Sequence, residues 1–307
     1  CLIKEVEYAR SHEPLQEVEE NPSVETVMKA RDIALEEKVD FVIGIGGGSP
    51  LDAAKAIALI THKADKDISY MYEPDGDSDA LPIVAIPTTC GTGSEATGVS
   101  VLTNTPKKSK GSIPHKLFPA LALVDGKYLK AAPFSVLANT AFDALTHIIE
   151  SDLNVRQTPY SHMCADAALR TWALSLPVLR KEIEPTDTHY MQMMRASTMA
   201  GMAIAHTGTS LPHALSYPLT FHLGVPHGVA TAYFITGYLL EAPEEKRDYI
   251  LRAAGFKDPG DLQTVYKNAC HLPDAADEKV AGVLEQSMKK LWNTPAKLHL
   301  EREHHLK

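Results

Sequence analysis

A carboxylate and an imidazole that could share one metal ion stand four residues apart in the second half of the chain. Asp143 and His147 lie in an apolar pattern of helical period, so their side chains project from one helix face, about 6 Å apart at Cβ. Carboxylate oxygens and imidazole nitrogens both bind divalent metals. The spacing therefore predicts two ligands of one ion on a single helix.

Two further imidazoles, His213 and His227, follow downstream, fourteen residues apart. On one straight helix they would be separated by roughly 21 Å, which is too far to share an ion. Pro218, Gly224 and Pro226 supply a break that would let the chain fold His227 back. Because the chain has 14 histidines, any one of them alone is better explained as a surface or core residue, and the prediction depends on the whole set.

One carboxylate with three imidazoles suits Fe(II) or Zn(II), and a catalytic ion of this kind keeps one coordination position open for a substrate oxygen. The predicted metal ligands are Asp143, His147, His213 and His227. The chemistry that this set predicts is polarisation of a substrate oxygen by a divalent metal.

A glycine-rich turn in the first half predicts a site for a phosphate group. Gly46, Gly47 and Gly48 follow a strand pattern and let the backbone approach an anion closely. Ser49 is the predicted N-cap, with Pro50 at the first helical position, and the free N–H groups of such a helix favour phosphate. The turn departs from the G-x-G-x-x-G pattern, so it predicts a pyrophosphate cradle without predicting a standard Rossmann domain.

A second loop, residues 87–95, also follows a strand pattern. Its hydroxyl groups include those of Thr88, Thr89 and Thr92. Alone, such a loop is more often without a ligand, but open parallel sheets bind ligands at the carboxyl ends of their strands. Paired with the glycine turn, it predicts a second wall of the nucleotide site.

The organisation of the chain changes near residues 125–133. Before that point short β-branched runs alternate with helical patterns, which predicts a parallel sheet with helical crossovers. The predicted strands are residues 40–45, 82–87 and 120–125. The predicted helices that follow are residues 136–153, 160–176, 189–206 and 228–240. We therefore predict an α/β nucleotide-binding domain over residues 1–130 and an all-α metal-binding domain over residues 131–307.

Composition narrows the classes of function. The formal charge of −9 argues against a nucleic-acid partner, because such binding uses clustered Lys and Arg. Four widely spread cysteines form no C-x-x-C pair, which favours a reducing, cytoplasmic setting. No apolar run approaches the roughly 18 to 20 residues that span a bilayer. We expect no membrane partner and a small-molecule substrate.

Four segments together resemble the iron-containing, group III alcohol dehydrogenases. They are residues 46–55, 88–95, 143–150 and 213–228, in the same order and with similar spacing as in that family. The resemblance implies a dehydroquinate-synthase-like fold with the active site in a cleft between two domains. It also implies hydride transfer between an alcohol or aldehyde and NAD or NADP, with iron or zinc at the four predicted ligands.

Taken position by position, the resemblance implies residues that line the nucleotide. They are Gly46, Gly47, Gly48, Ser49, Asp52, Thr88, Thr89, Thr92 and Lys110. Lys110 stands fifteen residues before Asp125, where the family usually carries a nucleotide-contacting lysine. Because members of this family often dimerise, the resemblance also suggests a homodimer.

Two departures from the family pattern matter. Many members carry a second histidine four residues after the position matched by His213, near the substrate, and this chain has Tyr217 there. Proton relay is then absent or assigned to the Tyr217 hydroxyl, whose ordinary pKa of about 10 makes it a poor base at neutral pH. About 20 residues precede Asn21, where the family has several more elements, so the α/β domain is expected to be incomplete.

Two other classes of function are open at this stage. A lyase of the 3-dehydroquinate synthase type would need a cluster of basic residues for a substrate phosphate near the metal, and no such cluster is found around residues 206–228. A non-catalytic metal- or nucleotide-binding relative would keep the site without turnover. Consumption of NADH or NADPH with short aldehydes distinguishes the dehydrogenase from these two classes.

Overall fold

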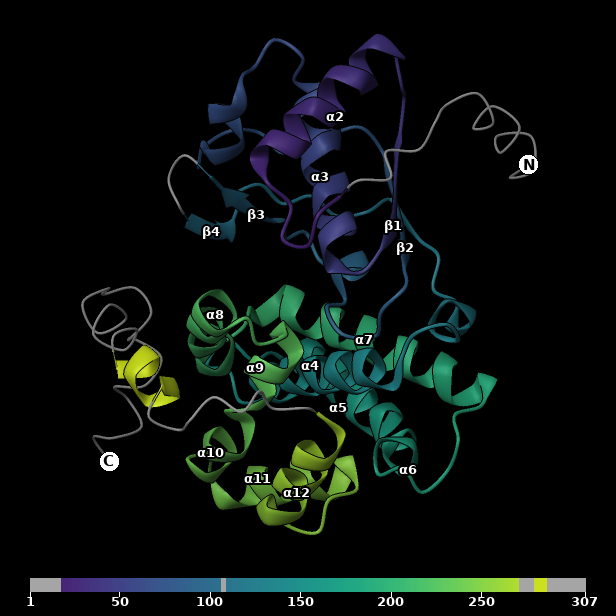
Figure 1. Cartoon of the computed structure of the whole chain (residues 1–307), viewed down its shortest axis with the longest axis vertical. Helices are drawn as coiled ribbons and strands as arrows, with labels where there is room; N and C mark the ends of the chain where they lie inside the picture. Colours follow the sequence, from purple (N-terminus) through teal and green to yellow (C-terminus); the bar gives the residue numbers. More distant parts are fainter. Residues whose placement is uncertain (1–17, 106–108, 271–278, 286–307) are drawn as a thin grey trace.

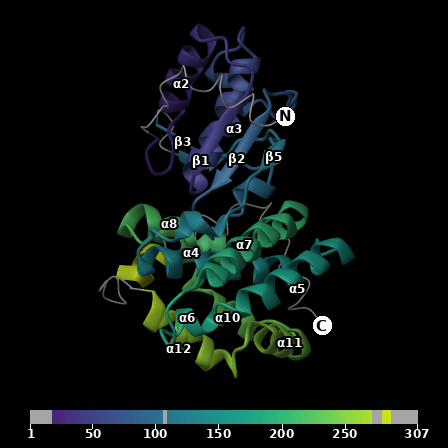
Figure 2. The same cartoon turned by 90° about the vertical axis from the view of Figure 1, so that its right-hand side faces the viewer.

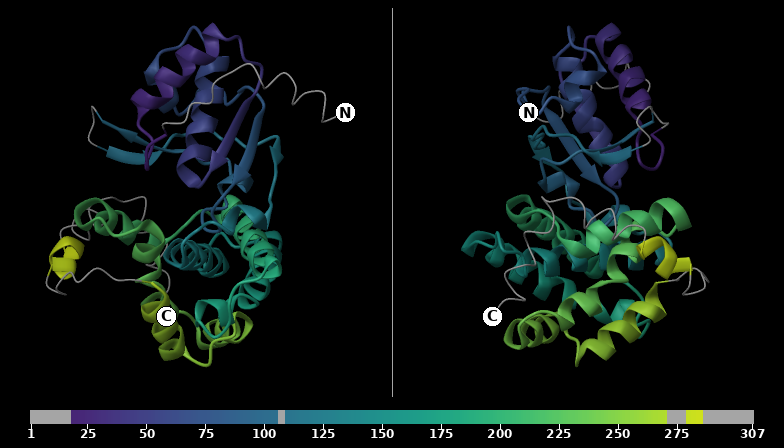
Figure 3. Two further views of the ribbon diagram at one scale, coloured as in Figure 1. Left: turned by 45° about the vertical axis from the view of Figure 1, so that its right-hand side comes forward. Right: turned by 90° about the vertical axis from the view of Figure 1, so that its left-hand side faces the viewer.

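The computed structural model describes residues 18–105, 109–270 and 279–285. These residues form two bodies, an α/β part that contains the strands and a helical part that begins after residue 133 (Figure 1). Figures 2 and 3 show the same two bodies from other sides, with the helical part lying beyond one end of the strands. The predicted α/β and all-α fold class is confirmed.

The parallel sheet has the order β1-β2-β5, formed by β1 (Val42–Gly46), β2 (Ile83–Pro87) and β5 (Leu121–Ala122). All three strands fall within the ranges predicted from sequence, or within one residue of them. Since both β1 and β2 are parallel, their carboxyl ends lie at the same edge of the sheet, and the glycine turn and the threonine loop start there.

Helix α3 (Gly48–His62) packs on β1 and β2, and α2 (Val24–Glu36) packs on α3 (Figure 1). The N-cap Ser23 starts α2, because its hydroxyl accepts a hydrogen bond from Thr26 N at 3.2 Å. The antiparallel hairpin of β3 (Val101–Asn104) and β4 (Ser109–Ser112) is absent from the sequence prediction. The short helices of this part are η2 (Ile68–Tyr72), η3 (Ser94–Ala96) and η4 (Gly126–Leu129).

The helical part contains nine named helices among the described residues. They are α4 (Phe134–Asp152), α5 (Pro159–Ala173), α6 (Leu176–Leu179), α7 (Asp187–Thr207), α8 (Leu211–Leu223), α9 (His227–Ala232), α10 (Ile235–Leu240), α11 (Glu244–Ala254) and α12 (Pro259–Ala269). Residues 279–285 are also helical. No helix among the described ranges is long and apolar enough to cross a membrane.

Three of the predicted helices match α4, α5 and α7, but the single helix predicted over residues 228–240 is wrong. The structure has α9 and α10 there, separated at Tyr233 and Phe234. The helical hydrogen-bond pattern changes at this point, because Phe234 N donates to Thr231 O, three residues back, at 3.3 Å. An apolar pattern cannot reveal this break, because both short helices bury their apolar side chains in the same core.

Helix α4 lies at the centre of the helical part, where it packs against α5, α7 and α9. Phe142 makes edge-to-face contacts with Trp172 and Tyr266, with ring centroids 5.8 and 5.5 Å away. Trp172 Nε1 donates to Ala141 O at 2.6 Å. These contacts fix the segment of α4 that carries Asp143.

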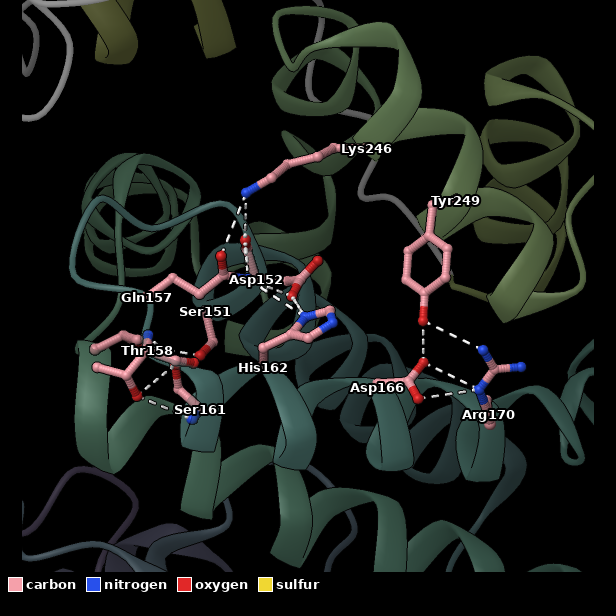
Figure 4. A network of polar contacts seen from close by, with 11 residues as sticks. Ser151, Asp152, Gln157, Thr158, Ser161, His162, Asp166, Arg170, Lys246 and Tyr249 are labelled. Carbon is pink, nitrogen blue, oxygen red and sulfur yellow. Dashed lines mark hydrogen bonds and ion pairs between the residues drawn. The ribbon is translucent and has the colours of Figure 1, made fainter.

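Polar contacts hold the carboxyl end of α4 (Figure 4). The buried Asp152 carboxylate lies 2.6 Å from His162 Nδ1 on α5 and accepts from Gln157 Nε2 at 2.7 Å, while Lys246 on α11 reaches the Asp152 carbonyl at 3.4 Å. A second group, in which α11 contacts α5, consists of Asp166, Arg170 and Tyr249. Side chains of α5 and α11 therefore fix the carboxyl end of α4 and hold those two helices to each other.

The two bodies meet at a contact that only small residues allow. Gly93, at a φ of 58°, packs on Gly201 of α7. A Cβ added at Gly201 would lie 2.4 Å from Gly93 O. Beside this contact Thr198 Oγ1 donates to Glu95 Oε1 at 2.6 Å. The threonine loop is thus held directly against α7.

A buried lysine on α3 fixes the loop that follows it. Lys55 Nζ is fully buried and donates to Ser94 O, Ser94 Oγ and Val99 O, each at 2.7 Å. The Asp52 carboxylate lies 3.7 Å from the same Nζ and accepts from Ser94 Oγ at 2.7 Å and from Val101 N at 3.0 Å. One ion pair therefore connects α3, the threonine loop and the start of β3.

Burial opposes both charges of this pair. It lowers the pKa of Lys55 to about 8, against the attraction of Asp52 and Glu95. It raises the pKa of Asp52 above its ordinary value, although Lys55 and the bond from Ser94 work in the other direction. The pair persists because hydrogen bonds satisfy both groups, and removing one partner would leave the other buried without compensation.

Replacement of the lysine tests this arrangement. We expect Lys55→Met to lower the free energy of unfolding by about 3 kcal/mol, because the Asp52 carboxylate loses its buried counter-charge. Urea denaturation followed by circular dichroism measures the change. The matched control is Lys63→Met, which removes a lysine that contacts Asp77 at the surface and should alter stability far less. Equal losses in the two variants would contradict a special role for Lys55.

Candidate metal and nucleotide site

Three of the four predicted metal ligands converge. Asp143, His213 and His227 each offer one ligand atom, and these atoms lie within 4.8 Å of one another. Asp143 Oδ1 is 3.7 Å from His213 Nε2 and 3.9 Å from His227 Nε2, which is too long for hydrogen bonds. Ligands of one tetrahedral ion at about 2.1 Å would stand roughly 3.4 Å apart. The separations are therefore close to those of atoms that share an ion.

The chain brings the two histidines together by reversing between α8 and α9. Gly224, at a φ of 65°, ends α8, and Pro226 precedes His227, the first residue of α9. The His213 and His227 rings then lie 5.4 Å apart. The predicted break is at Gly224 and Pro226, whereas Pro218 lies inside α8 and does not interrupt it.

The fourth predicted ligand, His147, lies beside the three-residue cluster and outside it. Its ring stacks on that of His213 with centroids 4.3 Å apart. His147 Nδ1 lies 3.1 Å from Gly91 O, and since a carbonyl only accepts, Nδ1 carries the proton and Nε2 keeps its lone pair. This is the form that a metal-binding imidazole requires, and a role for His147 as a ligand stays a prediction.

The site contains a polar atom that a metal would satisfy. His213 Nε2, which lies 3.7 Å from Asp143 Oδ1, is buried and has no hydrogen-bond partner. On its other side the His213 ring contacts the Glu150 carboxylate through Nδ1, and His213 N donates to Glu150 Oε1 at 3.0 Å. A carboxylate behind a metal-binding histidine fixes the tautomer that leaves Nε2 free for the ion. The donor set fits a divalent transition metal.

Glu150 is the functional residue that sequence reasoning missed. It is fully buried on α4, seven residues after Asp143 and three after His147, so it lies near both on the same helix. A charged residue in an otherwise apolar helical pattern was the available signal. Its partner His213 is 63 residues away in sequence, and spacing alone could not identify that contact.

The charges of the cluster are balanced internally. Burial alone would raise the pKa of Asp143, but the neighbouring imidazoles outweigh it and hold that pKa below its ordinary value. Burial lowers the pKa of His147, and it lowers the pKa of His227 to about 4 against the attraction of Asp143. For His213 the Glu150 carboxylate outweighs burial and raises the pKa. Two of the imidazoles are therefore neutral at neutral pH, as metal ligands must be.

The glycine turn and the threonine loop lie against each other. A Cβ added at Gly47 would be 3.2 Å from Thr89 Cγ2, and one at Gly48 would be 2.8 Å from Thr92 Cγ2. Thr88 N donates to the carbonyl of Gly46 at 2.8 Å. The structure thus brings the predicted glycines and the predicted threonines into one surface at the carboxyl ends of β1 and β2.

The predicted N-cap Ser49 is wrong. Helix α3 begins at Gly48 with Gly47 as its N-cap, and the Ser49 hydroxyl instead accepts from Asn21 N at 3.1 Å. Pro50 stands at the third helical position, two later than predicted, and fits because the first turn of a helix needs no donor there. The helix still begins at the glycine turn, so its free N–H groups face the same place.

Two other residues implied for the nucleotide take different positions. The Asp52 carboxylate is occupied by Ser94 and Val101, so it positions the loop around the turn. Lys110 extends from the hairpin, contacts the Asn21 side chain, and places Nζ 5.9 Å from the centre of the Tyr217 ring. Lys110 therefore bridges from the α/β part to α8.

The threonine loop connects the two halves of the site. Its Gly91 lies so close to α4 that an added Cβ would be 2.9 Å from Thr140 O and 3.1 Å from Asp143 Oδ2. Two residues earlier, Thr89 contacts the glycine turn. A single loop thus touches both the helix that carries Asp143 and the glycine turn.

These features define a two-part protein with an α/β body and a helical body whose candidate ligands meet between them. Family comparison agrees, since iron-containing alcohol dehydrogenases match over residues 4–126 and the C-terminal region of the Fe-containing alcohol dehydrogenase family matches over residues 137–293. The chain belongs to the iron-containing alcohol dehydrogenase family.

Individual relatives support the same assignment. A probable alcohol dehydrogenase, EutG, of Salmonella typhimurium is 36% identical over 218 residues, which are 70% of this chain and 54% of the relative. The 1-propanol dehydrogenase PduQ of Citrobacter freundii is 32% identical over 85% of this chain and 65% of its own length. The chain thus spans about half to two thirds of the length of these relatives.

Solved structures share the fold. The iron-containing alcohol dehydrogenase of Thermotoga maritima aligns with a TM-score of 0.77 and 36% identity over 93% of this chain and 79% of that chain. The sulfoacetaldehyde reductase of Bifidobacterium kashiwanohense, solved in complex with NAD+, aligns with a TM-score of 0.82 and 28% identity over 99% of this chain and 86% of that chain.

Glu150→Gln tests the carboxylate behind His213. We expect the dissociation constant for Zn(II) to rise about 10- to 100-fold, because the amide keeps the shape but loses the charge that orients the imidazole. Competition with a chromogenic chelator measures it, and Glu244→Gln at the exposed start of α11 is the control.

The same variant has a predicted pH dependence. The raised pKa of His213 means that its proton competes with the metal at mildly acidic pH, so affinity increases as pH rises. Without the Glu150 charge the pKa of His213 falls, so the increase in metal affinity should occur at lower pH. An unchanged affinity and pH profile would show that Glu150 does not act on His213.

Gly228→Ala tests the packing that places His227. An added Cβ would lie 2.0 Å from Asn139 O, so α9 must move away from α4. We expect a loss of about 1 to 3 kcal/mol in stability together with a marked loss of metal affinity. Gly237→Ala in α10, where a Cβ meets no atom within 4 Å, should be neutral or slightly stabilising. Thermal melts with and without Zn(II) compare the two, and equal behaviour would contradict the packing argument.

Proposed function

We propose that the protein is a metal-dependent alcohol dehydrogenase that transfers a hydride between an alcohol or aldehyde and NAD or NADP. One observation carries the proposal: Asp143, His213 and His227 converge on a common point, and the loop that touches Asp143 also touches the glycine turn. A metal ligand set beside a phosphate cradle is what hydride transfer from a metal-bound alcohol needs.

In this proposal Asp143, His147, His213 and His227 hold one Fe(II) or Zn(II) ion. When bound, the ion acts as a Lewis acid that polarises the substrate oxygen. The chain supplies the neutral imidazoles and the ionised carboxylate, and Glu150 holds the His213 ring in the required tautomer. Family membership favours iron, while the donor set fits both metals.

The nucleotide would lie along the glycine turn. The N–H groups of Gly46 to Ser49 at the start of α3 would bind its pyrophosphate, and Thr88, Thr89 and Thr92 would form the wall beside this turn. Lys110 supplies a positive charge between this wall and α8. Relatives differ in their nucleotide, with NAD+ in one solved complex and NADPH in a butanol dehydrogenase of Clostridium saccharobutylicum, so we propose NAD or NADP.

The Tyr217 hydroxyl would act as a hydrogen-bond donor and not as a base. Burial, together with Glu150, Asp143 and Asp52, raises its pKa to about 12, so the phenol stays protonated at neutral pH. A protonated hydroxyl can donate a hydrogen bond to a substrate oxygen but cannot accept a proton from it in the way that a neutral histidine can.

Partners and setting are part of the proposal. We propose a small alcohol or aldehyde as substrate, a homodimer, and a reducing, cytoplasmic compartment, which is supported by free thiols at Cys90, Cys164 and Cys270. The relatives reported above are dehydrogenases or a reductase by name, and none of them favours the lyase alternative.

The test is nucleotide turnover combined with metal analysis. With Fe(II) or Zn(II) bound, the protein should consume NADH or NADPH steadily with short aldehydes, followed at 340 nm. We expect His213→Ala to lose both bound metal and at least about 100-fold in turnover. His222→Ala, an exposed histidine later on α8, is the control and should keep both. Tight metal binding without any turnover would show a binding protein instead of a dehydrogenase.

A further inference from the structure

A threonine of the helical part bonds a buried carboxylate at the end of the threonine loop, residues 87–95. Thr198 Oγ1 on α7 donates to Glu95 Oε1 at 2.6 Å, which is the length of a charge-assisted O–H···O bond. Glu95 is 4% exposed, and burial raises the pKa of its carboxyl, while the bond from Thr198 and the attraction of Lys55 act in the opposite direction. Thr198 therefore stabilises the charged form of a carboxyl that belongs to the other body.

The two residues before Glu95 are also held in place. Gly93 packs on Gly201, which follows Thr198 on α7. Ser94 accepts hydrogen bonds from the buried Lys55 Nζ through both its carbonyl and its hydroxyl, each at 2.7 Å. The end of the loop is thus fixed from α7 on one side and from α3 on the other.

The middle of the same loop reaches both halves of the candidate site. Gly91 O accepts the Nδ1 hydrogen of His147 at 3.1 Å, and a Cβ added at Gly91 would lie 3.1 Å from Asp143 Oδ2. The next residue, Thr92, lies against the glycine turn, since a Cβ added at Gly48 would be 2.8 Å from Thr92 Cγ2. These two residues stand only four and three positions before Glu95, so a displaced Glu95 would displace contacts to both halves.

We propose that Thr198 is a positioning residue that acts through Glu95 and keeps the threonine loop in the conformation that both the metal ion and the nucleotide require. This inference rests on the proposed function, since it concerns the two ligands of that site. In the wild type each ligand meets a loop that is already in place. With the loop released, each ligand alone would have to order it, and its apparent affinity would fall with the fraction of molecules in the competent conformation.

Removal of the hydroxyl tests this role. Thr198→Val keeps the shape of the side chain but takes the donor from the buried Glu95 carboxylate. We expect the dissociation constants for Zn(II) and for the reduced nucleotide, NADH or NADPH, each to rise about five- to tenfold when the ligand is measured alone. Competition with a chromogenic chelator gives the first constant, and nucleotide fluorescence gives the second.

Recovery by the second ligand distinguishes positioning from general damage. The ligand that binds first orders the loop, so saturating nucleotide should return the Zn(II) constant of Thr198→Val to within about twofold of the wild-type value, and Zn(II) should do the same for the nucleotide. Linkage requires the two factors to be equal. All titrations are made well below the unfolding temperature of each variant, because ligands also stabilise a partly unfolded protein.

Three further variants serve as controls. Thr198→Ser keeps the hydroxyl and should keep both wild-type constants. Thr171→Val on α5 removes a hydroxyl that bonds the carbonyl four residues back, as Thr198 also does, but that does not bond the loop, and it should change neither constant. In a Glu95→Gln background Thr198→Val should have a smaller effect than in the wild type, because the hydroxyl acts through this carboxylate.

The inference is overturned if Thr198→Val changes neither constant, raises only one of them, or shows a rise that the second ligand does not relieve. Thr198→Ala replaces the valine variant, with the same expectations, if the latter does not fold. A wild type that binds both ligands but oxidises no alcohol contradicts the proposed function and leaves these binding results decisive for Thr198. A wild type that binds only one of the two ligands contradicts both.

Discussion

The buried carboxylate of Asp143 is the constraint on which the arrangement of the helices depends. It is 2% exposed on a helix whose other neighbours are mostly apolar, and an unpaired charge at such a position would be very unfavourable. On α9, Thr231 Oγ1 donates to Asp143 Oδ1 at 3.3 Å, and the imidazoles of His213 and His227 stand 3.7 and 3.9 Å from the same oxygen. This arrangement requires the reversal at Gly224 and the close approach of α9 at Gly228, so one buried carboxylate constrains where α8 and α9 pack.

The α/β part also contains buried charged groups that are stabilised by partners nearby. There the buried pair is Lys55 with Asp52, and its hydrogen bonds run to the backbone of the threonine loop. That loop then reaches α7 through Gly93 and Glu95, and α4 through Gly91. Both buried charges therefore fix the same loop, so the cradle and the metal cluster cannot shift independently.

Local patterns in the sequence were enough for the features that depend on neighbours in the chain. The four-residue spacing of Asp143 and His147, the glycine turn after β1 and the three strands follow from short periodicities and are present in the structure. The hairpin of β3 and β4, the N-cap of α3 and the role of Glu150 could not be predicted. The last two depend on partners distant in sequence, Asn21 for Ser49 and His213 for Glu150. The hairpin pairs neighbouring segments, but β4, Ser109–Ser112, contains no apolar residue that would mark it as a strand.

The candidate ligands differ in how firmly the fold holds them. His213 is fixed twice by Glu150, through its ring and its backbone, and Asp143 lies in the most tightly packed turn of α4. His227 stands at the start of a six-residue helix, with its Nδ1 unpartnered and its side chain 31% exposed. His227 is therefore less constrained by the helices than the other two residues of the cluster. Its ring stacks on that of Tyr217 with centroids 5.9 Å apart, and Lys110 Nζ lies over the Tyr217 ring, so the contact that restricts this imidazole comes from an aromatic side chain of α8.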